Sequence, residues 1–194
     1  MERANPTVPG TPESAASDFP PVRMTLRDGR SVTLRAIRPD DADAMRAALD
    51  GLSAEARYSR FMGAVNVTPA LVERAVRPPA DRDRALVAVA GEGTDEAIVG
   101  GARYIGGGDG KTCEFAVTIT EGWRGAGLAS SMLRALIADA ASRGLKRMEG
   151  YVLAENRSML DLARRLDFEV GASDEGPSVK LVWLDLVRAH GGGN

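Results

Sequence analysis

Residues 113–132 read CEFAVTITEGWRGAGLASSM, a stretch that predicts a strand, a glycine-rich loop and a helix in direct succession. Its first half is rich in β-branched residues, which favour strands. Gly122, Gly125 and Gly127 give the loop its backbone freedom. From Leu128 onward the apolar residues recur with the period of a helix. A helix that begins directly after such a loop presents free N–H groups and the positive end of its dipole, so the stretch predicts an anion site, most often for phosphate.

The residues that follow the last glycine narrow down the kind of phosphate. A nucleoside-triphosphate loop needs Lys followed by Ser or Thr at this point, whereas Gly127 is followed by Leu128 and Ala129. A dinucleotide-binding fingerprint needs a third glycine where Ser130 stands. A structural glycine turn without a ligand is the remaining alternative, and the loop by itself does not exclude it.

The composition is that of a single globular domain. A chain of 194 residues can bury a full core, and 44% hydrophobic and 27% charged residues are ordinary for a soluble protein. A net charge of -2 does not favour bulk binding of nucleic acid. One cysteine and one histidine argue against a disulfide framework and a Cys/His metal cluster, so no metal is expected. No apolar run has the length of a membrane span or the pattern of a signal peptide, which predicts a cytoplasmic location and no membrane contact.

Glycine and proline residues mark the expected boundaries between segments of the chain. Residues 1–21 predict a disordered tail, residues 22–190 one domain, and residues 191–194 a loose end. Helical spacing is expected at 42–50, 53–61, 69–76, 128–143 and 156–166, and strands at 31–37, 85–90, 97–104, 112–120, 147–153, from 168 and at 179–187. The strands between 85 and 120 are joined by short turns and predict an antiparallel meander. The segment from 114 to 153 is long enough for a right-handed parallel crossover.

The residues around the loop resemble a known family. The run from Arg124 to Ala129, RGAGLA, is similar to the Q/R-x-x-G-x-G/A signature of the GNAT superfamily of acyl-CoA-dependent N-acyltransferases, and LAEN at 153–156 with LDF at 166–168 resembles its later motif. LRDGRSVTLRAIRPDD, SAEARYSRF and EGYVLAENRSMLDLARRLDF resemble the GNAT domain of bacterial protein lysine acetyltransferases. The resemblance implies an α/β (α+β) fold with a mixed, mostly antiparallel sheet of about six or seven strands, helices on both faces and one parallel pair beside the glycine-loop helix.

The same resemblance implies that acetyl-CoA is the acyl donor. Val117, Thr118 and Ile119 would pair their backbone with the pantetheine arm, like an added strand. Backbone amides would cradle the pyrophosphate, with Arg124 opening the loop, and the residues concerned are Gly125, Ala126, Gly127, Leu128, Ala129 and Ser130. Asn156 matches the position whose side-chain amide bonds the pantetheine, and it is equally well placed to be a helix N-cap.

Acyl transfer to an amine requires a neutral nitrogen, whereas a lysine side chain has a pKa of about 10.4. A carboxylate is therefore expected to accept a proton. Glu114 stands where catalytic glutamates occur in the protein-acetyltransferase branch, and its alternative is an exposed or salt-bridged strand glutamate. Glu149, on the neighbouring predicted strand, is the second candidate. Cys113 adjoins Glu114 but would face the other side of the sheet without a nearby histidine, so a covalent cysteine mechanism is disfavoured.

Two positions depart from the family pattern. Many members carry a tyrosine seven residues after the asparagine as general acid, and here that position is Ala163. Tyr151, Tyr104 or Tyr58 is the substitute, or the departing thiol needs no acid because its pKa is only about 8.5. Asp167 replaces the usual glycine before a phenylalanine, and aspartate tolerates a left-handed turn better than most residues.

Three functions are consistent with these residues: an N-acetyltransferase acting on a protein lysine, one acting on a small-molecule amine, and a non-catalytic acyl-CoA-binding module. A closed pocket of acidic and aromatic groups would favour the small amine, and an open cleft the protein lysine. Residues 57–61, RYSRF, are interpreted either as a wall of the acceptor cleft or as an ordinary amphipathic helix. A monomer and a homodimer are both compatible with the sequence.

Overall fold

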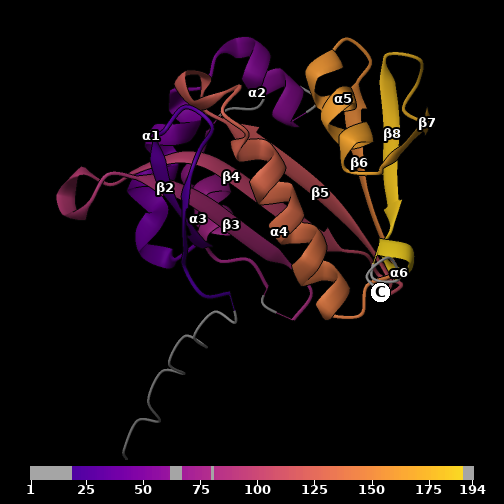
Figure 1. The fold of residues 1–194 in the computed structure, drawn as a ribbon, viewed down its shortest axis with the longest axis horizontal. Coiled ribbons are helices and arrows are strands. Elements are labelled where there is room, and N and C mark those ends of the chain that lie inside the picture. The colour runs from indigo at the N-terminus through magenta and orange to yellow at the C-terminus, as the bar shows by residue number, and fades with distance from the viewer. Residues whose placement is uncertain (1–18, 62–66, 80, 190–194) are drawn as a thin grey trace, which may run out of the picture.

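The computed structural model describes residues 19–61, 67–79 and 81–189. Most of the predicted N-terminal tail and all of the predicted C-terminal end lie outside the described residues. The described part is built around one sheet, shown in Figure 1.

Eight strands form this sheet in the order β1-β2-β3-β4-β5-β6-β8-β7. Every neighbouring pair is antiparallel except β5 and β6, which are parallel. The strands are β1 Val22–Thr25, β2 Ser31–Ala36, β3 Arg84–Ala90, β4 Ala97–Gly106, β5 Thr112–Ile119, β6 Arg147–Leu153, β7 Glu169–Ala172 and β8 Val179–Asp185. The mixed sheet with its single parallel pair confirms the predicted fold class.

Helices cover both faces of the sheet. They are α1 Ala42–Asp50, α2 Ala54–Phe61, α3 Pro69–Val76, α4 Leu128–Ser142, α5 Arg157–Arg165 and α6 Leu186–Ala189. Helix α4 lies across the front of the sheet in Figure 1, and α1 and α3 lie behind it. Helix α3 starts with Pro69 in its first turn, and the Thr68 hydroxyl accepts a hydrogen bond from the Leu71 amide.

Strand β3 shows how the sequence separates the two faces. Its residues RALVAVA are almost all buried, as expected for a central strand covered on both sides. Leu86 and Ala88 belong to the large core beneath α4, whereas Val87 and Val89 pack with Ile98 against α1. The alternation of one strand therefore supplies two cores.

A buried polar cluster fastens α4 to the sheet. Asp139 of α4 accepts hydrogen bonds from the Tyr104 hydroxyl at 2.6 Å and from Arg84 Nε at 3.0 Å, and Arg143 pairs with the same carboxylate. Burial, and then the hydrogen bond to Asp139, raise the pKa of Tyr104. Tyr104 comes from β4 and Arg84 from β3, so one carboxylate holds two strands and the helix together.

Element ends differ from the predictions mainly at the edges of the sheet. The sheet has one strand more than the seven predicted, because the edge strand β1 has only four residues and is too short to show a clear period; the strand predicted from residue 168 is β7. The last strand ends at Asp185 instead of residue 187, since the buried Leu186 donates its amide to the Lys146 carbonyl and starts α6. Asp167 adopts a φ of 64°, the left-handed turn predicted for it.

Replacement of Asp139 by alanine should lower the free energy of unfolding by about 3–5 kcal/mol, because Arg84 would remain buried without its partner. Urea denaturation measures the loss. The matched control is Asp161→Ala on α5, whose pair with Arg164 is exposed and should be worth less than about 1 kcal/mol. Equal losses in the two variants would contradict a role for the buried cluster in holding α4.

Candidate active site

The site begins where β5 and β6 separate. These strands share only three register pairs, the last of which joins Glu114 to Glu149. Beyond it, β5 remains paired with β4 as far as Ile119, and β6 remains paired with β8. Figure 1 shows the two strands diverging from this point. The backbone of residues 115–119 therefore presents an edge without a strand partner in the middle of the sheet.

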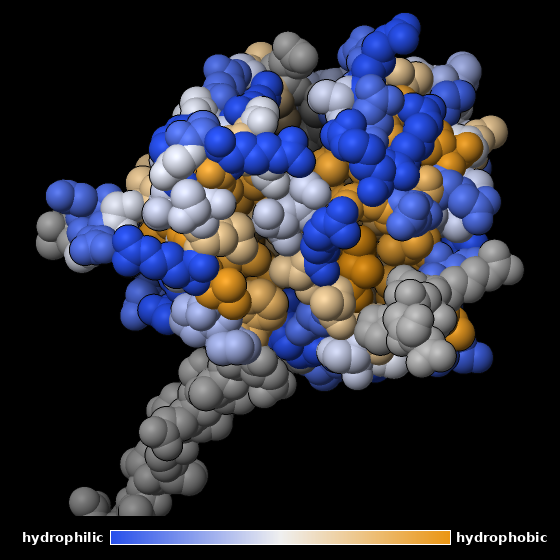
Figure 2. All heavy atoms as spheres, viewed as in Figure 1, coloured by the Kyte–Doolittle hydropathy of each residue, from blue (hydrophilic) through white to orange (hydrophobic). Residues whose placement is uncertain are grey.

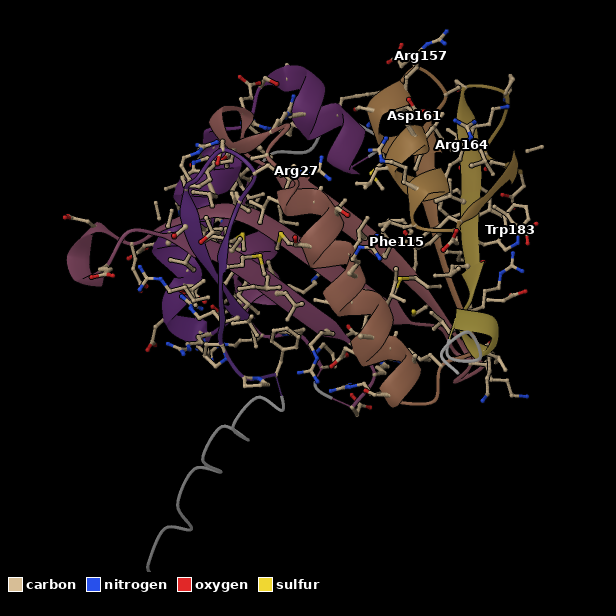
Figure 3. The ribbon with its side chains drawn as sticks, in the orientation of Figure 1. Arg27, Phe115, Arg157, Asp161, Arg164 and Trp183 are labelled. Carbon is tan, nitrogen blue, oxygen red and sulfur yellow. The ribbon has the colours of Figure 1, made fainter. Side chains whose placement is uncertain are left out.

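An aromatic ring occupies the α4 side of this separation. A Cβ added to Gly150 on β6 would lie 2.8 Å from Cε1 of Phe115, so only glycine lets the ring lie this close to β6. The Phe115 ring also packs against Phe168, with centroids 5.2 Å apart. Figure 3 shows Phe115 between α4 and β6. On the same face, hydrophobic surface lies between α4 and α5, and hydrophilic side chains cover α5 (Figure 2).

The glycine loop has the conformation that its sequence predicts. Gly125 and Gly127 have φ values of 77° and 91°, and Gly127 is the N-cap of α4 without a side-chain cap. The first backbone hydrogen bond of the helix runs from the Ser131 amide to the Gly127 carbonyl. Within the described ranges, no hydrogen bond is donated by the amides of residues 125–130. The loop therefore directs a series of free donors, at the positive end of α4, toward an anion.

The turn between β1 and β2 braces this loop, which sequence reasoning did not anticipate. The Arg27 amide donates to the Ala126 carbonyl at 3.2 Å. Arg30 donates to the Gly122 carbonyl at 2.9 Å and stacks on the Trp123 ring, with Cζ 3.9 Å from its centroid. The signal in the sequence was the pair of arginines around the Asp28-Gly29 turn, but nothing local connects that turn to a loop about a hundred residues later.

The side chain of Arg27 lies over the glycine loop. A Cβ added to Gly127 would be 3.3 Å from Arg27 Nε, and Figure 3 shows Arg27 beside the start of α4. Asp28 is already engaged by Arg30, and Arg27 has no ion pair among the described residues. A guanidinium at the positive end of a helix is repelled by it, and an anion bound between them would remove that repulsion. Arg27 is thus a functional candidate that the sequence motifs missed.

Two carboxylates stand side by side at the point of separation. Glu114 and Glu149 are register partners on parallel strands and share one face of the sheet. Glu149 is half-buried and accepts a hydrogen bond from Arg147 Nε at 3.2 Å. Glu114 is exposed and has no hydrogen bond or ion pair within the described ranges. Of the two predicted bases, Glu114 is the one whose oxygens are free to accept a proton.

The three tyrosines differ in their access to this point. Tyr151 lies two residues after Glu149 on β6 and so shares its face. Burial, and then neighbouring carboxylates that include Glu149 and Glu114, raise the pKa of Tyr151, so its phenol keeps its proton at neutral pH. Tyr104 is buried beneath α4 and bonded to Asp139, which excludes it as a general acid. Tyr58 is 50% exposed on α2, a helix that contacts β5.

Cys113 is a core residue. It is 1% exposed and faces α4, away from Glu114. Burial, and then the charges of Glu149 and Asp139, raise the pKa of the Cys113 thiol to about 12. A protonated, enclosed thiol is a poor nucleophile, so the structure argues against a covalent cysteine mechanism.

The remaining predicted residues divide between the backbone edge, the loop and α5. Val117 and Ile119 face the α4 core, whereas Thr118 faces the opposite side. Asn156 is the N-cap of α5, because its Oδ1 accepts the Met159 amide at 3.1 Å, and no donor bond of its Nδ2 is recorded within the described ranges. Ala163 is fully buried in the core.

Arg124 is exposed and donates from Nε to the Ile119 carbonyl. The side chains of residues 59–61 in the RYSRF segment lie outside the described residues, which leaves both interpretations of that segment untested. In the part of the chain that the structure describes, no group of three or more His, Cys, Asp or Glu side chains could hold a metal, and no helix is both long and apolar enough to cross a membrane.

An unpaired strand edge, a loop of free amides and an adjacent carboxylate lie together in this candidate site. Comparison with known proteins identifies the family. Residues 31–169 match the family model of the acetyltransferase (GNAT) domain. An acetyltransferase of Pseudomonas aeruginosa is 33% identical over 159 residues, which cover 81% of this chain and 85% of that protein. The chain therefore belongs to the GNAT family of acetyltransferases, and it is an acyltransferase.

Solved structures show the same fold. The GNAT domain of S. lividans PAT superposes with a TM-score of 0.76 at 22% identity, covering 85% of this chain and 96% of that domain. The ribosomal-protein acetyltransferase RimL, solved in complex with coenzyme A, superposes with a TM-score of 0.62 at 14% identity and covers 79% of this chain and 93% of that one.

The alkylation rate of Cys113 tests whether its thiol is enclosed in the core, as its raised pKa and burial indicate. At pH 8 the native protein should react with iodoacetamide at least about a hundredfold more slowly than the urea-unfolded chain, because a thiol of pKa about 12 is almost wholly protonated there and a free one of pKa about 8.5 is not. Mass spectrometry of labelled protein measures both rates. Rapid labelling of the native protein would show that the thiol is open to the site.

Proposed function

We propose that the protein transfers an acetyl group from acetyl-CoA to a primary amine, with a protein lysine as acceptor and Glu114 as general base. The observation that carries this proposal is the separation of β5 from β6 past Glu114, next to a loop whose amides have no acceptor among the described residues. An extended ligand that ends in phosphate groups can pair with the strand edge and place its phosphates in the glycine loop.

Backbone groups of the protein provide most of the proposed contacts with the donor, acetyl-CoA. Residues 117–119 offer the strand edge, along which the amide groups of pantetheine can bond as an added strand does. The amides of residues 125–130 and the Arg27 guanidinium surround the place for the pyrophosphate. The Nδ2 of Asn156 remains available to donate to the pantetheine while its Oδ1 caps α5. The solved complex of RimL with coenzyme A, which has the same fold, supports this proposal.

Electrostatic attraction favours a positively charged amine as the acceptor. A lysine ammonium is attracted to the paired carboxylates of Glu114 and Glu149, and Arg147 already neutralises the second of them. The exposed position of Glu114 supports a macromolecular acceptor, because a side chain that projects from a protein can reach it without entering a closed pocket.

The reaction then proceeds by direct attack. Glu114 takes a proton from the ammonium, and the freed nitrogen lone pair forms a bond to the acetyl carbonyl carbon. The C–S bond breaks, its electron pair leaves with sulfur, and the nitrogen passes its remaining extra proton to water, which completes the amide. The thiolate of CoA receives a proton from the Tyr151 phenol or from water. Because Ala163 is buried where many relatives have a tyrosine, no acid comes from that position.

The donor site is tested by affinity. Acetyl-CoA at a hundredfold excess over its dissociation constant should stabilise the protein by about 2.7 kcal/mol, seen as a shift of the melting temperature. Gly127→Val should abolish the shift, and Arg27→Met should weaken CoA binding about tenfold by removing one charge-assisted contact. Binding of acetyl-pantetheine, which lacks the pyrophosphate, should not change in Arg27→Met. Arg164→Met on α5 is the control and should bind CoA as the wild type does. Wild-type CoA affinity in both Gly127→Val and Arg27→Met would show that the glycine loop does not bind the cofactor.

The base is tested by turnover. Glu114→Gln should reduce the rate of acetyl transfer to lysine-containing protein substrates roughly 10²–10⁴-fold and leave the affinity for acetyl-CoA nearly unchanged. Release of CoA thiol measures the rate, and calorimetry measures the affinity. Glu149→Gln should cost less, because that carboxylate already pairs with Arg147. A Glu114→Gln enzyme with the wild-type rate at neutral pH would show that the base is elsewhere.

A further inference from the structure

A second hollow lies on the face of the sheet opposite α4. It is a cavity of about 130 Å³ between α1, α3 and strands β3, β4 and β5. Its walls are mainly aliphatic and include Ile37, Met45, Leu49, Leu52, Leu71 and Ile98. Such walls suit a short aliphatic group.

The floor of the cavity includes a glycine, Gly101, which has no side chain to fill the space above it. A Cβ added to Gly101 on β4 would meet no heavy atom within 4 Å. Its neighbour Gly100 differs, since a Cβ there would lie 2.9 Å from the Ile119 side chain on the α4 face. Successive strand residues face opposite ways, so Gly101 faces the cavity.

Two polar groups on that floor have no partner in the part of the chain that the structure describes. Thr118 is the register partner of Gly101 on β5, and its buried Oγ1 makes no hydrogen bond there. Arg103 lies two residues after Gly101 on the same face, lines the cavity, and has no hydrogen bond or ion pair among the described residues. Buried hydroxyls are normally bonded, so the enclosed Thr118 hydroxyl at the wall of the cavity and the Arg103 guanidinium that lines it call for an acceptor.

The charged residues among the described lining of the cavity, Arg74 and Arg103, are both basic. Burial lowers the pKa of Arg103 and the nearby charge of Arg74 lowers it further, whereas Asp83 and Glu114 act in the opposite direction. Arg74 is exposed and also lines the cavity, but no Asp or Glu is among its described lining residues. An anion bound beside Arg103 would satisfy the guanidinium and the Thr118 hydroxyl at once.

We propose that this cavity binds a short aliphatic carboxylate, whose oxygens accept from Arg103 and Thr118 and whose hydrocarbon chain lies among the aliphatic walls. A cavity of similar size holds benzene, so a chain of about four to six carbon atoms fits. Arg103 shares its sheet face with Glu114. A ligand there lies beside the acceptor side of the enzyme.

Calorimetric titration with hexanoate, in the absence of CoA, tests the site. Wild-type protein should bind hexanoate, and hexylamine, which has the same chain with a cationic head, should not bind. Gly101→Val should abolish binding because its side chain fills the floor, and Arg103→Met should weaken it about tenfold, the loss of one charge-assisted bond. The controls are Gly108→Val, a second glycine where a Cβ meets nothing within 4 Å, and Arg164→Met. Both should bind as the wild type does.

Thr118→Val provides a second test of the cavity if Gly101→Val does not fold. It should weaken hexanoate binding, and it should also raise the melting temperature of the ligand-free protein, because a buried hydroxyl without a partner is removed. Absence of binding at millimolar hexanoate, equal binding of hexylamine, or wild-type affinity in Arg103→Met and Thr118→Val would each overturn the proposal.

Discussion

The parallel contact between β5 and β6 stops after three register pairs, and the arrangement of the site follows from that limit. A strand edge inside a sheet normally pairs with its neighbour, because unpaired N–H and C=O groups are costly when buried and adhesive when exposed. Here the Phe115 ring lies against Gly150 on the α4 side, and each strand keeps its partner on its other side. The sheet stays intact while a polar edge is left open for a ligand.

Strand β5 connects two regions of opposite charge. The free amides and Arg27 gather positive charge at the end of β5 that leads into α4, and Glu114 and Glu149 gather negative charge where β5 and β6 part. Roughly 17 Å of extended backbone separates Glu114 from Ile119. The regions of positive and negative charge therefore lie toward opposite ends of the same strand.

The sequence predicts those features that depend on neighbours in the chain. The strand, glycine loop and helix of residues 113–132, the left-handed Asp167 and the cap at Asn156 all follow from local periodicity and backbone preference. The contact of Arg27 with the loop after β5 depends on how the turn of a hairpin three strands away packs against that loop. The fit of Phe115 to Gly150 and the hollow at Gly101 depend on what faces each residue across the sheet, which no local pattern encodes.

The brace between the β1–β2 turn and the glycine loop makes the amino-terminal edge of the sheet responsive to the ligand. Strand β1 is short and bonded on one side only, so it opens easily. An anion that holds Arg27 would resist that opening, and the free energy of binding would be distributed over a hairpin that never contacts the reacting atoms. Amide hydrogen exchange in residues 22–34 would therefore slow when the loop is filled, which makes the mobility of the hairpin a distant reporter of the occupied site.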